Sequence, residues 1–551
     1  MKNGKKKLKK NTAEMLVRCL EAHGVKYIFG VPGEENLTFL ETVRRSKIKF
    51  ITTRHEQVAA FMAATIGRMT GKIGVALSTL GPGATNLMTG VAYAQLGGFP
   101  LLVITGQKPI KKNKQGKFQI VDIVAMMKPV TKYSATITKG EDVPSMVAEA
   151  IKLAETERPG AVHLELPEDI AEEICNAKPI AVPKIIYPKA DKKSVNEALA
   201  IIKDSKHPIV ILGGGVNRKF LFREVGEFLR KTRIPFITTP TGKGAFDESS
   251  ELYIGTTALS KGDFANQALL AADAIVLIGH DVANTPPIIL TSLDAPNCKV
   301  VHVNFFSSSA KDVYIPTHEV IGDIANTLSE FTKKITINPS WDFGYFLKVR
   351  DAFRAYLARY ADSQDFPLRP ERVISDIQKS LPSPGTLALD NGMYKIYLGR
   401  QFVTREQNSL LLDNALATMG AGLSSGMTLK MLYPKRKVIV VAGDGGLMMT
   451  IADLETAVRL KIDLVALILD DSGYGMISWK QKRMKLPSFG ISFGNPDFVT
   501  LAESFGAIGH KVSKAEDLLP TLKKALNSKG MHIIACPINY KEANKKLGSS
   551  F

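Results

Sequence analysis

The sequence has few cysteines and no long uninterrupted hydrophobic run. Its four cysteines, Cys19, Cys175, Cys298 and Cys536, stand far apart and form no C-x-x-C pair, which argues against a disulfide framework, a zinc site or a redox pair. We interpret them as buried apolar residues. No segment approaches the roughly 18 consecutive apolar residues that span a bilayer, and the lysine-rich start is not followed by an apolar signal core. We therefore expect a cytoplasmic protein without a membrane partner.

Aromatic residues are also scarce, at 7% of the chain, whereas basic residues are in excess and give a formal net charge of +19. The first ten residues hold six lysines and no acid, so part of this charge belongs to a basic N-terminal arm, residues 1–10. The other basic residues are spread over many predicted helices and are not gathered into a stripe interleaved with aromatic side chains. We therefore expect no nucleic-acid partner, and keep a basic RNA-associated protein as the non-enzymatic alternative.

The chain of 551 residues is too long for one hydrophobic core and is expected to form several domains. Short β-branched runs alternate with helix-period segments, which predicts an α/β fold of doubly wound parallel sheets. The predicted strands are 27–29, 50–53, 74–78, 101–105, 209–212, 275–278, 300–303, 438–442 and 464–469. Segments rich in proline and lysine interrupt the pattern. We predict three doubly wound parallel-sheet domains at 11–180, 190–335 and 366–545, with a helical linker at 336–365.

The third predicted domain contains a Gly-Asp-Gly-Gly turn at 443–446, between the strand 438–442 and a helical segment that leads to the strand 464–469. A right-handed crossover makes the two strands parallel, so Asp444 and Asp471 follow strand ends at one edge of the sheet, where such sheets bind ligands. Two carboxylates beside a glycine-rich turn at the start of a helix suit Mg²⁺ bridging a diphosphate, and the carbonyl of Gly473 could complete the coordination. The alternative to a metal site, if either motif is considered alone, is a purely structural role: a Gly-Asp turn and an aspartate that caps a helix.

The pairing of Gly-Asp-Gly with an aspartate in a turn 27 positions later resembles the thiamine-diphosphate-binding signature. The segments 443–460 and 473–476 are similar to acetolactate synthases in particular. In the first domain, the segments 29–33, 54–57, 59–63, 80–86 and 104–107 resemble, in order, the pyrimidine-binding domain of the same family. The resemblance extends over nearly the whole chain and implies pyrimidine-binding, central and diphosphate-binding domains, in that order.

Thiamine diphosphate reacts through a carbanion at its thiazolium C2. A carboxyl group that hydrogen-bonds the ring nitrogen N1′ of its aminopyrimidine favours an imino form, whose nitrogen can take the C2 proton. Glu56 is a candidate because it follows the strand 50–53 and begins an apolar helix. Glutamate is also common in a first helical turn because of the helix dipole. The resemblance implies that Glu56 is the activating glutamate. It also implies that Met419 supports the bent cofactor.

The resemblance and the spacing together give a full set of expected site residues. The expected catalytic residues are Glu56, Gln119 and Met419. The metal ligands would be Asp444, Asp471 and Gly473. The expected cofactor contacts are Pro32, Gly33, Glu56, Asn86, Gly392, Tyr394, Met419, Gly443, Asp444, Gly445, Gly446, Tyr474, Gly475, Met476 and Ile477. The expected substrate contacts are Phe118, Gln119, Ile477 and Lys480.

Three departures from the family pattern affect what the resemblance implies. Tyr394 stands where the family has a histidine near the diphosphate, and its hydroxyl can still donate a hydrogen bond. Lys480 stands where catabolic synthases carry glutamine and biosynthetic ones tryptophan. It either pairs with a substrate carboxylate or belongs to a solvated basic loop. The segment 279–285 stands where flavin-containing enzymes of the family have an arginine-rich stretch. Binding of FAD is therefore unlikely to uncertain, although the glycine turn at 213–215 could approach a nucleotide. That turn lacks the G-x-G-x-x-G fingerprint, so an oxidoreductase is poorly supported.

The implied reaction is the decarboxylation of pyruvate and the addition of the resulting hydroxyethyl carbanion to a second 2-keto acid, so that two pyruvates give 2-acetolactate and CO₂. Another thiamine-diphosphate-dependent 2-keto acid decarboxylase or carboligase is the alternative. The resemblance implies that Glu56 and the metal ligands meet across a subunit boundary, with a homodimer as the minimal active unit and a homotetramer as the usual assembly. The preferred second keto acid, a regulatory small subunit, and a role in branched-chain amino acid biosynthesis or acetoin formation stay open.

Overall fold

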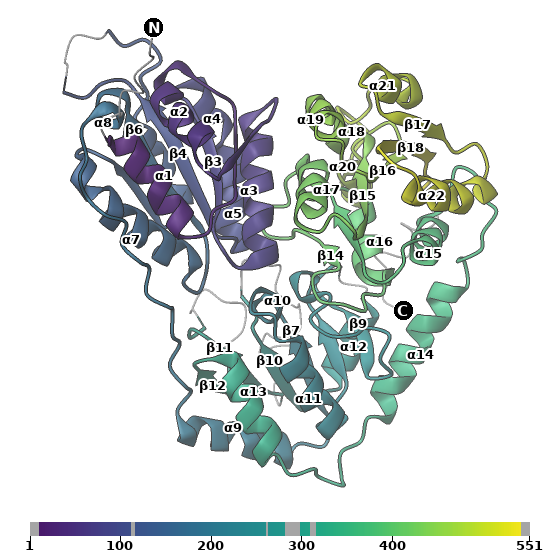
Figure 1. Cartoon of the computed structure of the whole chain (residues 1–551). Helices are drawn as coiled ribbons and strands as arrows, with labels where there is room; N and C mark the ends of the chain where they lie inside the picture. Colours follow the sequence, from purple (N-terminus) through teal and green to yellow (C-terminus); the bar gives the residue numbers. More distant parts are fainter. Residues whose placement is uncertain (1–9, 112–115, 261–262, 282–297, 309–315, 542–551) are drawn as a thin grey trace, which may run out of the picture. The chain divides into compact units, whose positions relative to one another are not determined.

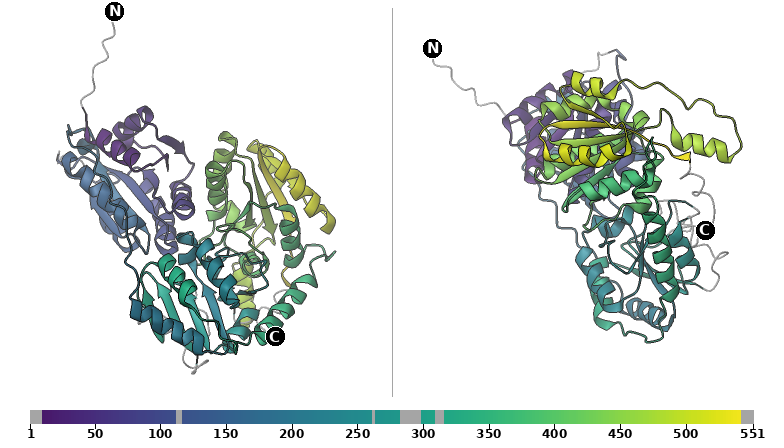
Figure 2. Two further views of the ribbon diagram at one scale, coloured as in Figure 1. Left: turned by 60° about the horizontal axis from the view of Figure 1, so that its bottom comes forward. Right: turned by 90° about the vertical axis from the view of Figure 1, so that its right-hand side faces the viewer.

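The computed structural model describes residues 10–111, 116–260, 263–281, 298–308 and 316–541. Within these ranges the chain forms three six-stranded sheets whose strands all pair in parallel, with helices on both faces of each (Figures 1 and 2). The prediction of three doubly wound parallel sheets is therefore confirmed. Residues 1–9 of the predicted arm and 542–545 of the third predicted domain lie outside the described residues. None of the described helices combines the length and the apolar character that crossing a membrane requires.

The chain divides into two compact units, Met1–Ile185 and Ile186–Phe551. The first unit contains one sheet, and the second contains the other two. The finer division into an arm, three domains and a linker stays a prediction. Part of the segment that we predict to be a linker is the helix α14 (Gly344–Ala358).

The first sheet has the strand order β2-β1-β3-β4-β6-β5. Its inner strands β3, β4 and β6 are buried along their whole length, so their side chains face helices on both sides. The strands are β1 (Tyr27–Gly30), β2 (Lys49–Thr52), β3 (Gly74–Ser78), β4 (Leu101–Gln107), β5 (Tyr133–Thr136) and β6 (Ala161–Pro167). One face carries α1 (Thr12–Ala22), α2 (Leu37–Arg45), α7 (Val143–Glu155) and α8 (Glu168–Glu172), and the other α3 (Glu56–Thr70), α4 (Pro82–Asn86) and α5 (Met88–Gly97) (Figure 1). The short α6 (Ile123–Met127) precedes β5.

Helix α3 is fixed at both ends and along its length, which positions Glu56 at its first residue. His55 caps the helix, and its Nδ1 accepts a hydrogen bond from the backbone N–H of Gln57 at 3.1 Å. The helix ends at Gly71, whose φ of 67° is a left-handed conformation that glycine adopts without a steric penalty. Helix α5 packs closely on α3, because a Cβ at Gly90 would lie 2.3 Å from the Cβ of Ala60.

The second sheet has the order β12-β11-β10-β7-β8-β9, which is the 3-2-1-4-5-6 order of dinucleotide-binding folds. Its strands are β7 (Pro208–Leu212), β8 (Phe236–Thr238), β9 (Tyr253–Thr256), β10 (Ala274–Ile278), β11 (Lys299–Asn304) and β12 (His318–Ile321). Helices α9 (Lys192–Asp204), α11 (Phe222–Thr232) and α13 (Ile324–Lys334) cover one face, and α12 (Phe264–Leu270) and α14 cover the other. The short α10 (Gly214–Arg218) follows β7.

The glycine turn after β7 packs against the backbone that follows β10. A Cβ at Gly213 would lie 2.5 Å from the carbonyl oxygen of Gly279, and the N–H of Gly215 donates a hydrogen bond to that oxygen at 2.7 Å. Close contact between the two loops therefore accounts for the glycines. The nucleotide contact that the turn could make stays a prediction, and residues 282–285 of the segment that bears on FAD lie outside the described residues.

The third sheet has the order β14-β13-β15-β16-β18-β17, which repeats the order of the first sheet strand for strand. Its strands are β13 (Gly385–Leu389), β14 (Leu410–Leu411), β15 (Lys437–Gly443), β16 (Leu464–Asp470), β17 (Ile508–Lys511) and β18 (Met531–Pro537). Helices α15 (Pro370–Ser380), α16 (Tyr394–Gln401) and α22 (Leu518–Asn527) pack on one face. The other face carries α17 (Ala421–Leu432), α18 (Asp444–Met448), α19 (Leu454–Arg459) and α21 (Phe498–Ser504). Helix α20 (Gly475–Arg483) buries none of its residues.

Candidate cofactor-binding site

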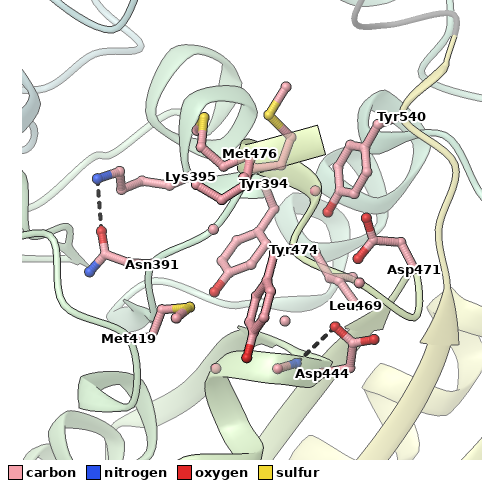
Figure 3. A pocket seen from close by; sticks show the side chains of 18 of the residues that line it. Asn391, Tyr394, Lys395, Met419, Asp444, Leu469, Asp471, Tyr474, Met476 and Tyr540 are labelled. Atoms are coloured by element: carbon pink, nitrogen blue, oxygen red, sulfur yellow. Dashed lines mark hydrogen bonds between the residues drawn. The ribbon is translucent and has the colours of Figure 1, made fainter. Parts of the chain in front are cut away.

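Asp444 and Asp471 come together as the βαβ pattern predicts. Strands β15 and β16 are parallel neighbours, and Gly443 at the end of β15 pairs in register with Leu469 of β16. Both aspartates directly follow these strand ends, although α18 and α19 separate them in the sequence. They line one cavity of about 380 Å³ and stand on the same side of it (Figure 3).

Every residue of the third predicted domain that we expect to contact the cofactor or the metal lines this cavity. These residues are Gly392, Tyr394, Met419, Gly443, Asp444, Gly445, Gly446, Asp471, Gly473, Tyr474, Gly475, Met476 and Ile477. The lining also includes residues that the sequence does not single out, namely Asn391, Met393, Lys395, Ala417, Leu469 and Tyr540. Segments far apart in the chain therefore converge on one site.

The acidic side of the cavity holds Asp444 and Asp471, and Asp470 stands directly before Asp471 at the end of β16. Asp444 is only 1% exposed, and burial raises its pKa above the ordinary value. Asn495 bridges Asp444 and Asp470, because its amide donates hydrogen bonds to Asp444 Oδ2 at 2.8 Å and to Asp470 Oδ1 at 2.9 Å. Loss of hydration and then the charges of Asp444 and Asp470 raise the pKa of Asp471 to about 7. A divalent cation here would offset the repulsion among the carboxylates.

The described residues contain no group of three or more His, Cys, Asp or Glu side chains arranged to hold a metal. A cation at this site would therefore be held by the carboxylates of Asp444 and Asp471 together with backbone and ligand oxygens. Magnesium commonly binds in that way, through one or two carboxylates and the phosphates of its ligand. The predicted third ligand, the carbonyl of Gly473, lies in the same lining.

The glycine turn leaves room that side chains would fill. A Cβ at Gly445 would lie 2.9 Å from Tyr474 Cε1 and 3.0 Å from Phe493 Cζ. The two aromatic rings pack edge to face, with their centroids 5.0 Å apart. A backbone without a side chain can therefore come close to a ligand beside these rings.

Tyr394 supplies a hydrogen-bond donor to the cavity. Its side chain is buried, and its hydroxyl donates no hydrogen bond to an acceptor within the described parts of the chain. The hydroxyl points into the cavity (Figure 3). Burial and then the charge of Asp390 raise the pKa of Tyr394 far above its ordinary value, which keeps the hydroxyl protonated. A buried donor without a partner fits a ligand that brings an acceptor, as a phosphate oxygen does.

In the first unit, Glu56 is 8% exposed and accepts a hydrogen bond at Oε2 from Asn86 Nδ2 at 3.0 Å. Its other oxygen faces Gly83, where a Cβ would lie 3.1 Å from Oε1. Asn86 itself is exposed. Two predicted cofactor contacts, Glu56 and Asn86, are therefore hydrogen-bonded to each other.

The loop between β3 and α4 also contacts two other predicted residues. A Cβ at Gly33 would lie 2.3 Å from the Cβ of Thr79, so only glycine fits there. Gln119 has a positive φ of 57°, and its carbonyl oxygen would lie 2.8 Å from a Cβ at Gly81. The structure thus gathers Gly33 and Gln119 around the loop that leads into α4, the helix that contacts Glu56, whereas Pro32 and Phe118 are exposed, Phe118 by 72%.

A buried carboxylate that sequence reasoning missed supports the same loop. Glu35 accepts hydrogen bonds from Thr79 Oγ1 at 2.5 Å and from Lys108 Nζ at 2.6 Å. Burial opposes ionisation, but these hydrogen bonds outweigh it and lower the pKa of Glu35. Glu35 is part of the motif Gly-Glu-Glu-Asn at 33–36, and a pair of acids after a glycine was the signal that could have drawn attention to it.

Two predicted substrate contacts lie on α20. Ile477 lines the cavity and is about half exposed, which places it at the rim. Lys480 is exposed and does not belong to the lining. Its predicted contact with the substrate therefore stays a prediction, as do the roles of Phe118 and Gln119.

Comparison with sequence families defines the class of the protein. The model of the thiamine pyrophosphate enzyme N-terminal TPP binding domain matches residues 10–126. The central-domain model of the same enzymes matches residues 195–331, and that of the C-terminal TPP binding domain matches residues 390–536. The protein is thus a thiamine pyrophosphate enzyme, and thiamine pyrophosphate is another name for thiamine diphosphate.

Curated relatives narrow the class. An acetolactate synthase of Bacillus subtilis (strain 168) is 30% identical, with 100% of this chain and 98% of the relative covered. The catabolic acetolactate synthase of Raoultella terrigena is 32% identical over 97% of this chain and 96% of the relative. A probable acetolactate synthase large subunit of Methanocaldococcus jannaschii is 30% identical over 96% and 92%. The chain belongs to the acetolactate synthase family of thiamine pyrophosphate enzymes.

Proposed function

We propose that the protein is a Mg²⁺-dependent acetolactate synthase, which decarboxylates pyruvate and joins the two-carbon fragment to a second 2-keto acid. With pyruvate alone the products are 2-acetolactate and CO₂. The observation that carries the proposal is the cavity that gathers Asp444, Asp471 and the glycine turn at 443–446. Similarity over nearly the full chain to proteins named acetolactate synthase supports the choice of reaction.

The diphosphate end of the cofactor fits the acidic side of the cavity. Asp444, Asp471 and the carbonyl of Gly473 would hold Mg²⁺, and the cation would hold the phosphate oxygens. The hydroxyl of Tyr394, which donates no hydrogen bond within the described chain, would donate to a phosphate group. The backbone at Gly445, where a side chain would collide with Tyr474, would lie close to the phosphates. Together these groups neutralise and orient a multiply charged ligand.

At the ring end, the cofactor supplies a nucleophilic carbon and an electron sink for decarboxylation. Glu56 holds a proton at the ring nitrogen N1′ of the aminopyrimidine. Asn86 occupies Oε2 of this carboxyl group, which leaves Oε1 for the ring. Met419 would support the rings of the cofactor, because an unbranched thioether adapts to an irregular gap. Gln119 and Ile477 orient the keto acid, and Lys480 would attract its carboxylate.

We also infer a homodimer as the minimal active unit and a homotetramer as the usual assembly. Glu56 belongs to the first compact unit and the cavity to the second. The family resemblance indicates that Glu56 of one copy serves the cavity of another. Sedimentation of the protein with thiamine diphosphate and Mg²⁺ measures this assembly directly.

The test of the proposed function is the variant Glu56→Gln, with Glu155→Gln as its matched control. Glu155 is also a largely buried glutamate of the first unit, but it lies on α7 and accepts hydrogen bonds from Lys72 and the backbone of Ile73. Glu56→Gln should leave folding intact and lower acetolactate formation about tenfold or more, because the carboxyl group acts only in activation. Glu155→Gln should keep the wild-type rate.

The assay supplies thiamine diphosphate, Mg²⁺ and pyruvate, with and without 2-ketobutyrate, and identifies the products. Acetolactate from pyruvate supports the proposal, whereas acetaldehyde alone would identify a simple decarboxylase. Near-wild-type turnover by Glu56→Gln would remove the proposed mechanism. Strong salt-dependent retention of RNA without any turnover would instead support the non-enzymatic alternative.

A further inference from the structure

The segment 413–420, which carries Met419, is held by side chains from the turn that leads into α16. Lys395 Nζ donates hydrogen bonds to Asn391 Oδ1 at 2.7 Å and to the carbonyl oxygen of Asp413 at 3.2 Å. Asn391 Nδ2 in turn donates to the carbonyl oxygen of Thr418 at 2.7 Å. The segment is therefore tied near its start and directly before Met419, and Lys395 takes part in both ties.

The segment needs these ties because its backbone is strained. Ala417 has a φ of 54°, a left-handed conformation that costs free energy in any residue with a side chain. The Asp413 carboxylate accepts hydrogen bonds from the backbone N–H groups of Ala415 and Ala417 at 2.9 and 2.8 Å. Such a conformation persists only where surrounding contacts hold it.

Lys395 is an unusual residue for this position. It is 8% exposed, and both of its hydrogen-bond partners are neutral oxygens. Burial lowers its pKa, although the charge of Asp413 opposes the shift. Burying an ammonium group without a close counter-charge costs free energy, so a purely apolar side chain would be the more stable choice for packing alone.

Lys395 can be compared with Lys430, another buried lysine of the described chain. Lys430 on α17 also donates to two carbonyl oxygens, those of Pro434 and Arg436, at 2.7 and 2.8 Å, and burial lowers its pKa as well. Lys430 joins a helix end to a loop and does not line the cavity. Lys395 lines the cavity, on the same side as Asn391 and Met419, and Asp444 and Asp471 stand on the other side (Figure 3).

We propose that Lys395 is a positioning residue for the ring end of the cofactor: through Asn391 and Asp413 it fixes the segment 413–420 so that Met419 supports the rings. The inference rests on the proposed function. It assigns Lys395 no contact with the phosphates. A ligand that has only the phosphate end should therefore be insensitive to its loss.

Titration calorimetry of the full chain with Mg²⁺ and two ligands distinguishes binding of the ring end from binding of the phosphate end of the cofactor. Thiamine diphosphate carries both rings and phosphates, and inorganic diphosphate carries phosphates alone. Lys395→Met should lower the affinity for thiamine diphosphate about tenfold, as expected for a lost hydrogen bond of a charged group. It should change the Kd of inorganic diphosphate less than about twofold. Lys430→Met is the matched control and should change neither affinity.

Met419→Ala should reproduce the pattern of Lys395→Met. Because both substitutions act on the same support, the double variant should bind thiamine diphosphate little worse than Met419→Ala alone. If Lys395→Met melts far below the wild type, Asn391→Ala is the replacement variant, because it removes hydrogen bonds of the same network.

If Lys395→Met lowers the affinity for thiamine diphosphate and for inorganic diphosphate equally, its effect on the cavity is general and the proposal is overturned. Unchanged affinity for both ligands, or fully additive losses in the double variant, would overturn it as well. A wild-type protein that binds inorganic diphosphate but not thiamine diphosphate would contradict the proposed function itself, and that outcome is distinct from the others.

Discussion

A buried histidine makes the stability of the first unit depend on pH. His163 in β6 is fully buried and shares hydrogen bonds with Thr105 Oγ1 at 2.8 Å and Ser134 Oγ at 2.9 Å. Burial lowers its pKa from 6.5 to about 3. The unfolded chain therefore binds this proton below pH 6.5 and the folded chain does not. Folding stability should fall as the pH is lowered from 6.5 toward 3.

The size of the effect follows from the two pKa values. Each pH unit between them costs about 1.4 kcal/mol of the free energy of unfolding. At pH 5, His163 should lower that free energy by about 2 kcal/mol relative to pH 8. The variant His163→Gln removes the titration and keeps a polar side chain, so its stability should not show this component.

Urea unfolding followed by far-ultraviolet circular dichroism, with both proteins at pH 8 and pH 5, measures the difference. His163→Gln should be less stable than the wild type at pH 8, because its hydrogen bonds are imperfect. The difference in the free energy of unfolding between the two proteins should shrink by about 2 kcal/mol at pH 5, because only the wild type must keep a histidine unprotonated on folding. Other titrating groups are present in both proteins and cancel. A gap of equal size at the two pH values would refute the argument.

Two further variants test the cofactor cavity. Tyr394→Phe removes a buried O–H that donates no hydrogen bond within the described chain, so the cofactor-free protein should melt no lower than the wild type while thiamine diphosphate binds roughly fivefold more weakly. Unchanged affinity in calorimetry would speak against the phosphate contact. Asn495→Ala removes the amide between Asp444 and Asp470, so the melting temperature without Mg²⁺ should fall, and the rise on adding Mg²⁺ and thiamine diphosphate should exceed that of the wild type. An equal rise in both proteins would contradict this reasoning.

The fold class could be predicted because inner parallel strands are buried on both faces and read as continuous apolar runs. Strands β3, β10 and β16 show such runs. The edge strands β5 and β17 were missed because they are only half-buried or exposed. Strand β6 was missed for another reason. It is an inner strand, but His163 and Glu165 interrupt its apolar pattern, and their partners come from neighbouring strands that the sequence does not reveal.

The site was predicted where its residues keep a fixed spacing along a βαβ unit, as Asp444 and Asp471 do. Asn495 has no such spacing, since a tertiary contact alone brings it to Asp444. Lys395 was missed because a lysine in a helix normally marks a solvent-facing position, whereas every residue of α16 is buried. Tyr540 reaches the cavity from beyond the last strand of the sheet, where no motif identifies it.

The first and third sheets share their strand order and belong to one polypeptide, and the single polypeptide has a consequence for how the enzyme is produced. One reading frame encodes both versions of the scaffold, the one that bears Glu56 and the one that bears Asp444 and Asp471. The cell therefore makes the two halves in equal numbers, whatever the level of expression, and needs no balance between separate genes.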